Sequence, residues 1–209
     1  MHRQKAFAGS PAQLRGLPQP VIATVNGAAA GAGFGLALGS DIRIAARAAS
    51  FSCAFVRVAM SSCGIGVSWL LPRAIGTSCA FEIMLMGREI SATEAERIGL
   101  VSELTEDEDL LAHAVEVARS ISGNSSFGVW MTKRGAWAGV QRAGLSTAIE
   151  LERRTQILAP TGDLQRSAKT LLNRAKNHSP ACKSHRGRSQ AGVLHTERWH
   201  HAKRDHQRT

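Results

Sequence analysis

A run of small residues is the part of this chain best suited to chemistry. Between Gly27 and Gly33 the sequence contains only alanine and glycine, and an apolar pattern begins again at Phe34. Residues without bulky side chains let a ligand approach the main chain itself. If a helix begins in this run, its first N–H groups lack partners and its dipole is positive there. Such a place suits an anion or a developing oxyanion.

The same run has a second interpretation, which is close packing of a helix against a sheet. Small residues allow both, and their spacing alone does not separate them.

Two predicted strands would hold this run in place. The apolar and β-branched residues of Val21–Val25 predict a short buried strand, which Asn26-Gly27 ends. After the predicted helix and a Gly39-Ser40-Asp41 turn, Ile42–Ala46 predicts a second strand. The β-rich zone is expected to run from Val21 to about Val58.

Beyond that zone the sequence predicts helix after helix. Four features carry the prediction: an apolar stretch that Gly87 ends, a capping box at Ser91–Glu94, the closing residue Gly99, and helical spacing over Leu110–Ile121. Two further helices are expected across Gly144–Leu158 and Asp163–Lys176.

The stretch VNGAAAGAGFGLALGSDIRIAARAASFS resembles the central signature of the enoyl-CoA hydratase/isomerase, or crotonase, family. The resemblance continues in family order and fades by about Asn177. Its further segments are Val56–Val58, Gly66–Ser68, Leu71–Arg73, Ile75-Gly76, Gly87–Ala92 and Ala95–Val101.

The resemblance implies an α/β fold: a crotonase-like ββα spiral core, incomplete at the N-terminus, with a C-terminal helical region. We expect a connector or helix remnant over 1–19, the core over 20–105, the helical region over 106–177 and a basic, disordered tail over 178–209. The chain resembles an N-terminally truncated member. The family's helical region forms trimers or pairs of trimers, so a homo-oligomer is expected.

The resemblance also implies acyl-CoA thioester substrates, whose carbonyl oxygen is held by two backbone N–H groups as an enolate develops. One donor aligns with Ala32, and the small neighbours Gly31 and Gly33 keep the approach open. The other donor belongs to an upstream motif that nothing in this chain matches. Coenzyme A enters as part of the substrate, and no further cofactor is expected.

The family's acid/base side chains are missing at their aligned positions. The two hydratase glutamates fall at Gly35 and Phe55, and the isomerase acid falls at Gly64. None of these residues can carry a proton. Two hypotheses stay open: an acyl-CoA enzyme of fatty-acid metabolism that relies on backbone amides, and a catalytically silent subunit that oligomerises or binds acyl-CoA without turnover.

Other polar residues have ordinary explanations in sequence. Asp41 is expected to cap or bridge its turn, and Glu82 and Glu89 are expected to be solvated charges. Cys63 lacks a nearby histidine to activate it. Five basic residues are expected either to meet CoA phosphates or to be surface charges: Arg43, Arg47, Arg57, Arg73 and, more weakly, Lys169.

Composition limits the other function classes. The formal net charge is +10, but Ser179–Thr209 holds seven basic and two acidic side chains without a nucleic-acid reading motif. Nucleic acid is therefore not an expected partner. The four cysteines lack metal-finger spacing, and the tail histidines lack a partner shell. No apolar run approaches the roughly 20 residues that span a bilayer, so we predict a cytoplasmic protein without a membrane partner.

Overall fold

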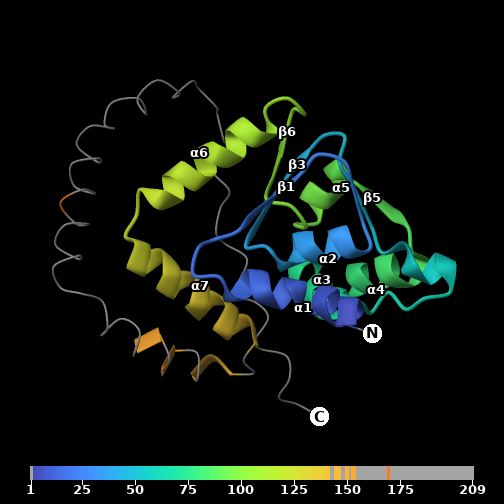
Figure 1. The fold of residues 1–209 in the computed structure, drawn as a ribbon, viewed down its shortest axis with the longest axis horizontal. Helices are drawn as coiled ribbons and strands as arrows, with labels where there is room; N and C mark the ends of the chain where they lie inside the picture. Colours follow the sequence, from blue (N-terminus) through green and yellow to red (C-terminus); the bar gives the residue numbers. More distant parts are fainter. Residues whose placement is uncertain (1, 142–143, 147–148, 151, 154–168, 170–209) are drawn as a thin grey trace, which may run out of the picture. The chain divides into compact units, whose positions relative to one another are not determined.

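The computed structural model describes residues 2–141, 144–146, 149–150, 152–153 and 169 (Figure 1). The chain divides into two units, Met1–Ser167 and Ala168–Thr209. Lys169, which is exposed and helical, is the described residue of the second unit. The predicted tail over 178–209 lies outside the described residues, as does most of the two helices predicted beyond Gly144. Everything below concerns the first unit.

Within the described residues, six short strands form two sheets. In the first, β1 (Ile22–Val25), β3 (Ile42–Ala46) and β6 (Glu103–Thr105) are parallel, with Ile22 opposite Ile42 and Ile44 opposite Glu103. In the second, β2 (Ala28–Ala30) is parallel to β4 (Ser50–Ser52), which is antiparallel to β5 (Glu89–Ser91).

The two predicted strands are confirmed as β1 and β3. The expectation of helices alone beyond residue 58 is wrong, because β5 and β6 lie there. Each has three residues, too few to display the alternation by which a strand is found in sequence.

The helices are α1 (His2–Gly16), α2 (Ala32–Gly39), α3 (Val67–Ile75), α4 (Thr77–Met86), α5 (Ala92–Arg97), α6 (Leu110–Ser122) and α7 (Ser126–Gln141), with a 3₁₀ helix, η1, over Ala54–Val58. The structure confirms the predictions of α4, α5 and α6. Sequence analysis did not predict α3 or α7. Within 1–19, most of the predicted connector is the helix α1, which packs against α2 (Figure 1).

The core lies between the second sheet and the helices α2, α3 and α4. Its largest buried side chains include Phe34 from α2 and Phe51 from β4, whose rings lie 5.8 Å apart in a tilted arrangement. Burying such rings supplies much of the free energy that holds α2 on the sheet. The start of α2 is therefore fixed by the core beneath it.

Candidate functional site

The run of small residues folds into β2 and the start of α2. The N–H of Gly31 donates to the carbonyl of Ser52 at 3.1 Å, and the N–H of Gly35 donates to the carbonyl of Gly31 at 3.0 Å. The amides of Ala32, Gly33 and Phe34 therefore precede the first intrahelical bond. No side chain caps this helix start, and these three amides have no acceptor within the described part of the chain.

Three glycines of this helix have a packing role. A Cβ at Gly31 would lie 2.9 Å from the Phe55 ring, one at Gly35 would lie 2.8 Å from Ile65, and one at Gly39 would lie 2.8 Å from Pro11. The spacing of four residues places these glycines on one face of α2. Close packing, the second interpretation of the small residues, therefore explains this face.

The opposite face of α2 borders a groove of about 490 Å³. The groove runs between α2 and β1, and its helical side is lined by Gly33, Leu36, Ala37 and Ser40. A Cβ at Gly33 would meet nothing within 4 Å, so the space beside this residue is open. We expected Gly31 to leave room for a ligand to approach the backbone, but the Phe55 ring occupies the space beside it.

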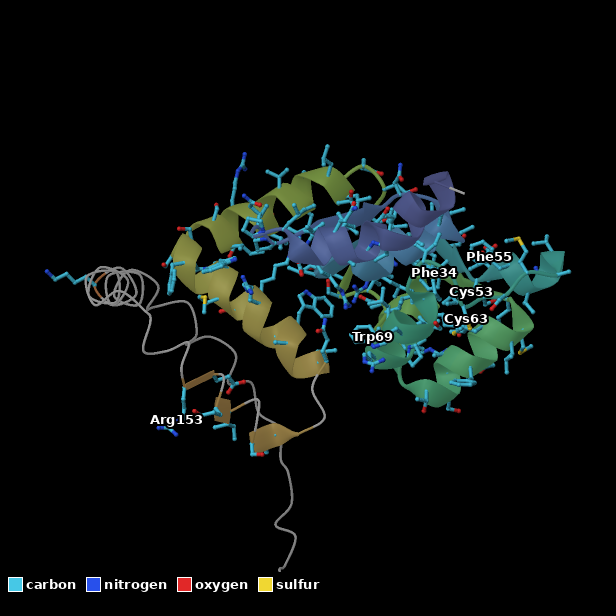
Figure 2. The ribbon with its side chains drawn as sticks, turned by 60° about the horizontal axis from the view of Figure 1, so that its bottom comes forward. Phe34, Cys53, Phe55, Cys63, Trp69 and Arg153 are labelled. Carbon is cyan, nitrogen blue, oxygen red and sulfur yellow. The ribbon has the colours of Figure 1, made fainter. Side chains whose placement is uncertain are left out.

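Gly35, Phe55 and Gly64 stand where the resemblance aligned the family's acids, and Figure 2 labels Phe55. Phe55 extends from η1 and covers Gly31, while the side chain and carbonyl of Ile65 cover Gly35. Gly64 lies in the loop before α3, where its carbonyl accepts the N–H of Val67 at 2.9 Å. Among the described residues, no carboxyl group lines the groove. The arrangement offers backbone donors without an acid/base side chain.

The expectation that Asp41 caps or bridges its own turn is wrong, because its carboxylate contacts distant elements instead. One carboxylate oxygen accepts the N–H of Val21 at 2.7 Å and pairs with the Nζ of Lys133 at 2.8 Å, and the other accepts the indole Nε1 of Trp137 at 2.7 Å. Asp41 therefore joins β1, β3 and α7. Its oxygens are fully engaged, which removes it as a general base.

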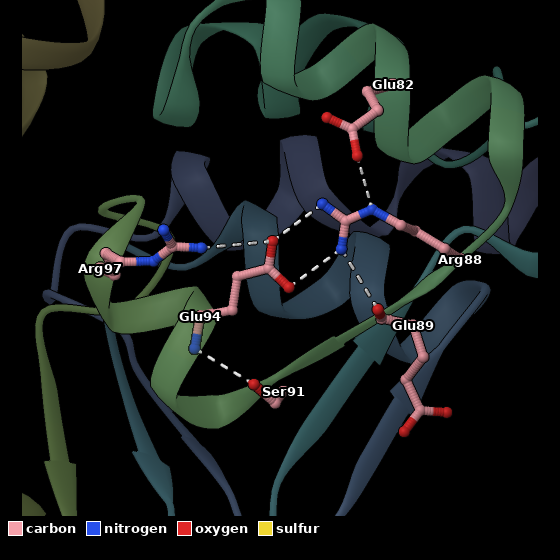
Figure 3. A network of polar contacts seen from close by, with 6 residues as sticks. All are labelled: Glu82, Arg88, Glu89, Ser91, Glu94 and Arg97. Atoms are coloured by element: carbon pink, nitrogen blue, oxygen red, sulfur yellow. Dashed lines mark hydrogen bonds and ion pairs between the residues drawn. The ribbon is translucent and has the colours of Figure 1, made fainter.

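Glu82 and Glu89 belong to a polar network outside the groove (Figure 3). Arg88 pairs with Glu82 at 2.8 Å and with both oxygens of Glu94, and it donates to the carbonyl of Glu89. The hydrogen bonds from Arg88 lower the pKa of Glu94. Ser91 Oγ accepts the Glu94 N–H at 3.2 Å, which confirms the predicted N-cap.

The candidate phosphate-binding arginines lie in different settings. Arg43 is largely buried and donates to the carbonyls of Leu100 and Ser40, and Arg47 pairs with Glu106 in an exposed ion pair. Arg57 lies on η1 and is exposed. Arg73 stacks on the Trp69 ring at 3.9 Å. None of these four lines the groove beside α2.

The two cysteines nearest the site differ in burial. Cys53, at the end of β4, is fully buried, and burial raises the pKa of its thiol to about 11. Cys63 is exposed. In the described residues, no group of three histidine, cysteine or acidic side chains could hold a metal ion.

Sequence analysis missed a second cluster, made of Arg15, Trp69 and Trp137. The Arg15 guanidinium lies 3.4 Å from the Trp137 ring centre and 4.9 Å from that of Trp69. These residues come from α1, α3 and α7, so no local pattern in the sequence joins them. The four tryptophans of the sequence gave no indication of which of them would contact Arg15.

Comparison with known proteins agrees with this architecture. The family described as enoyl-CoA hydratase/isomerase matches residues 3–178. The chain belongs to the enoyl-CoA hydratase/isomerase family. In the described residues, no helix combines the length and apolar character needed to cross a membrane.

Similar curated and solved proteins carry related names. A probable enoyl-CoA hydratase of Mycobacterium tuberculosis is 50% identical over 139 residues, which are 66% of this chain and 49% of the relative. The 1,2-epoxyphenylacetyl-CoA isomerase of Escherichia coli is 41% identical over 70% of this chain and 55% of its own length. This chain thus spans about half the length of the curated relatives it matches.

The solved structures show the crotonase fold. A probable enoyl-CoA hydratase/isomerase from Mycobacterium abscessus superposes with a TM-score of 0.72 at 42% identity, covering 74% of this chain and 59% of the other. An enoyl-CoA hydratase from Bacillus anthracis gives a TM-score of 0.77 at 32% identity, covering 86% and 68%.

Proposed function

We propose that this protein binds acyl-CoA thioesters, with the thioester oxygen held by the N–H of Ala32. The main supporting observation is that three amides at the start of α2 have no partner among the described residues, beside a groove that Gly33 leaves open. A carbonyl oxygen that gains charge would be stabilised there by the amides and the helix dipole. The names of the relatives, which include CoA-ester hydratases and isomerases, support the ligand class.

The enzyme hypothesis assigns enolate stabilisation to these backbone amides. No described side chain at the groove can take up or release a proton. The amides would therefore stabilise the charge on the thioester oxygen, while another group would have to transfer the protons. Hydration or isomerisation in fatty-acid metabolism therefore requires a group from outside the described site. A trimer or hexamer of this chain in the cytoplasm stays a prediction of the family resemblance.

The alternative is a subunit that binds acyl-CoA without turnover. The acid positions Gly35, Phe55 and Gly64 favour it, because none of them carries a carboxyl group. The Phe55 ring and Ile65 also fill the spaces beside Gly31 and Gly35. In this case the groove retains the ligand while the acid positions serve only packing.

Two measurements separate these functions. Hydration of crotonyl-CoA is followed by the loss of absorbance of the conjugated thioester, and binding of acetoacetyl-CoA is followed by calorimetric titration. Turnover supports the enzyme hypothesis, whereas binding without turnover supports the silent subunit. Absence of binding would overturn both.

The variant Ala32→Pro tests the placement of the oxygen. Proline is well accepted at the first position of a helix, where it removes the N–H without removing an intrahelical bond. Loss of one oxyanion donor typically costs about 10²–10³ in rate. The matched control Ala32→Ser keeps the N–H and is expected to bind and react as the parent does. If the proline variant behaves like the serine variant, Ala32 is not the donor.

A further inference from the structure

A second cavity, of about 550 Å³, lies between α1 and α3 and reaches the end of α7. It shares no lining residue with the groove beside α2. Its wall is mostly apolar or small, and its polar side chains are those of Arg15, Trp69 and Gln141. The full lining is Ala8, Pro11, Ala12, Arg15, Gly66, Trp69, Leu70 and Gln141.

Two indole rings hold the charged group in this cavity. The Arg15 guanidinium stacks closely on Trp137, at 3.4 Å, and more loosely on Trp69, at 4.9 Å (Figure 2 shows Trp69). Arg73 stacks on Trp69 as well, at 3.9 Å, and is anchored by a hydrogen bond to the Trp69 carbonyl. Cation–π contacts fix the orientation of a guanidinium but leave its N–H donors, which lie in its own plane, without acceptors.

Arg15 lacks the acceptor that its position calls for. Its Nε is buried and has no hydrogen-bond partner within the described residues. Asp41 is the carboxylate whose charge acts on Arg15, yet its oxygens are already engaged by Lys133, Trp137 and the Val21 amide. A charged donor removed from water without an acceptor is costly, and a ligand that supplies one would relieve that cost.

The electrostatic surroundings favour an anion with more than one charge. Arg43 and Arg73 act on Arg15 as additional positive charges, and burial, the larger effect, lowers the pKa of Arg15 to about 10. The guanidinium is therefore still protonated at neutral pH. Arg15 and Arg43 both interact with the carboxylate of Asp41, which also pairs with Lys133, so the surroundings of Arg15 are rich in positive charge.

We propose that this cavity binds the phosphate group of a small phosphorylated molecule. Arg15, which lines the cavity, donates to it through the N–H groups of its guanidinium, in the two-pronged geometry that guanidinium and phosphate share. Arg73, which stacks on Trp69, contributes further positive charge, and Gln141 lines the cavity. This cavity is separate from the groove proposed to bind acyl-CoA, because the two have no lining residue in common.

Inorganic phosphate is the probe, and intrinsic tryptophan fluorescence is the signal, since two of the four tryptophans flank Arg15. The titration is made at neutral pH and constant ionic strength, with acetate as the monoanionic comparison. We expect a saturable change with phosphate and a weaker one with acetate. A linear response to phosphate, or an equal response to both anions, would overturn the assignment.

Two arginine variants locate the site. Arg15→Gln is expected to weaken phosphate binding by about tenfold or more, because it removes a charge-assisted pair of hydrogen bonds. Arg47→Gln is the matched control, as it removes the same charge from an exposed pair with Glu106. Equal binding by the two variants would place the phosphate elsewhere, including the basic segment that contains Trp199.

A measurement on the unaltered protein covers the case in which Arg15→Gln fails to fold. Phenylglyoxal modifies accessible arginines, and mass spectrometry of the peptides reports each site. Phosphate is expected to protect Arg15 and leave Arg47 as reactive as before. Unchanged modification of Arg15 in saturating phosphate would overturn the proposal.

Discussion

The Nζ of Lys133 lies 2.8 Å from the carboxylate of Asp41, an ion pair that joins α7 to the start of β3. The Lys133 side chain is only 5% exposed and also donates to the carbonyls of Leu14 and Gln19. One lysine therefore ties α7 to the segment that leads from α1 into β1. The sheet beneath the candidate groove depends on this tie.

Lys133→Met is expected to destabilise the protein by about 3–5 kcal/mol, because it removes the buried ammonium that contacts the Asp41 carboxylate and two carbonyls. Urea unfolding followed by circular dichroism measures the change. The control is Arg153→Met, which removes an exposed partner of Glu150 and should leave the midpoint nearly unchanged. Comparable losses in the two variants would contradict a special role for the buried pair.

Substitutions at two glycines of α2 should act in opposite directions. Gly35→Ala would bring a Cβ within 2.9 Å of the Ile65 carbonyl, which is backbone and cannot swing away, so we expect a loss of about 1–3 kcal/mol. Gly33→Ala meets nothing within 4 Å and gains helix propensity, so its stability should be unchanged or higher.

The same geometry predicts that a glutamate cannot simply be restored to this site. Gly35→Glu would carry the same clashing Cβ, and it is expected to unfold at a lower temperature without gaining crotonyl-CoA hydration. Thermal melts and the hydration assay measure the two effects together. A stable Gly35→Glu protein with hydratase activity would show that Ile65 moves aside.

Stability in acid should depend on Glu94. Hydrogen bonds from Arg88 lower the pKa of Glu94 from its ordinary 4.5, so its stabilising effect is complete above that value. It is lost as the pH falls through the lower folded-state pKa, because the unfolded chain then binds the proton more readily.

Glu94→Gln should therefore be less stable than the parent at neutral pH, and the difference should shrink as the solution is acidified below about pH 4. Denaturant midpoints measured across this range test the point. The control is Glu96→Gln, an exposed residue of the same helix. A difference between Glu94→Gln and the parent that stays constant with pH would contradict the assignment.

The sequence predicts those features that depend on neighbouring residues. The capping serine of α5, the end of α4 at Gly87 and the two longer strands follow from local patterns. The helix start at Ala32 came from the family resemblance, and the structure places free amides there. The helix α7 escaped prediction because Gly128, Gly135 and Gly139 interrupt a weakly amphipathic pattern.

Features that depend on distant contacts could not be found in this way. The covering of Gly31 by Phe55 and of Gly35 by Ile65 joins segments that only the fold brings together. The spacing of Gly31, Gly35 and Gly39 did indicate one small-residue face, but it could not say what packs there. Likewise, nothing near Asp41 in sequence points to Lys133 or Trp137.

The reactivity of the cysteines reports whether the end of β4, where Cys53 lies, is closed to solvent. At pH 8 the buried Cys53, with a pKa of about 11, has roughly one thousandth of its thiol as thiolate. Burial also blocks access to the sulfur, and Ser62 bonds the Cys53 carbonyl to the following loop at 3.0 Å. Iodoacetamide should therefore modify the exposed Cys63 well before Cys53, as read by mass spectrometry of the peptides.

Denaturation should remove this difference, because unfolding exposes the Cys53 sulfur and removes the burial that raises the pKa of its thiol. In a Cys63→Ser background, the rate at which Cys53 is alkylated then measures how often the end of β4 opens. Slow alkylation that tracks the urea unfolding curve would place Cys53 in the globally stable core. Fast alkylation in native buffer would instead show that η1, and with it Phe55, separates readily from the start of α2.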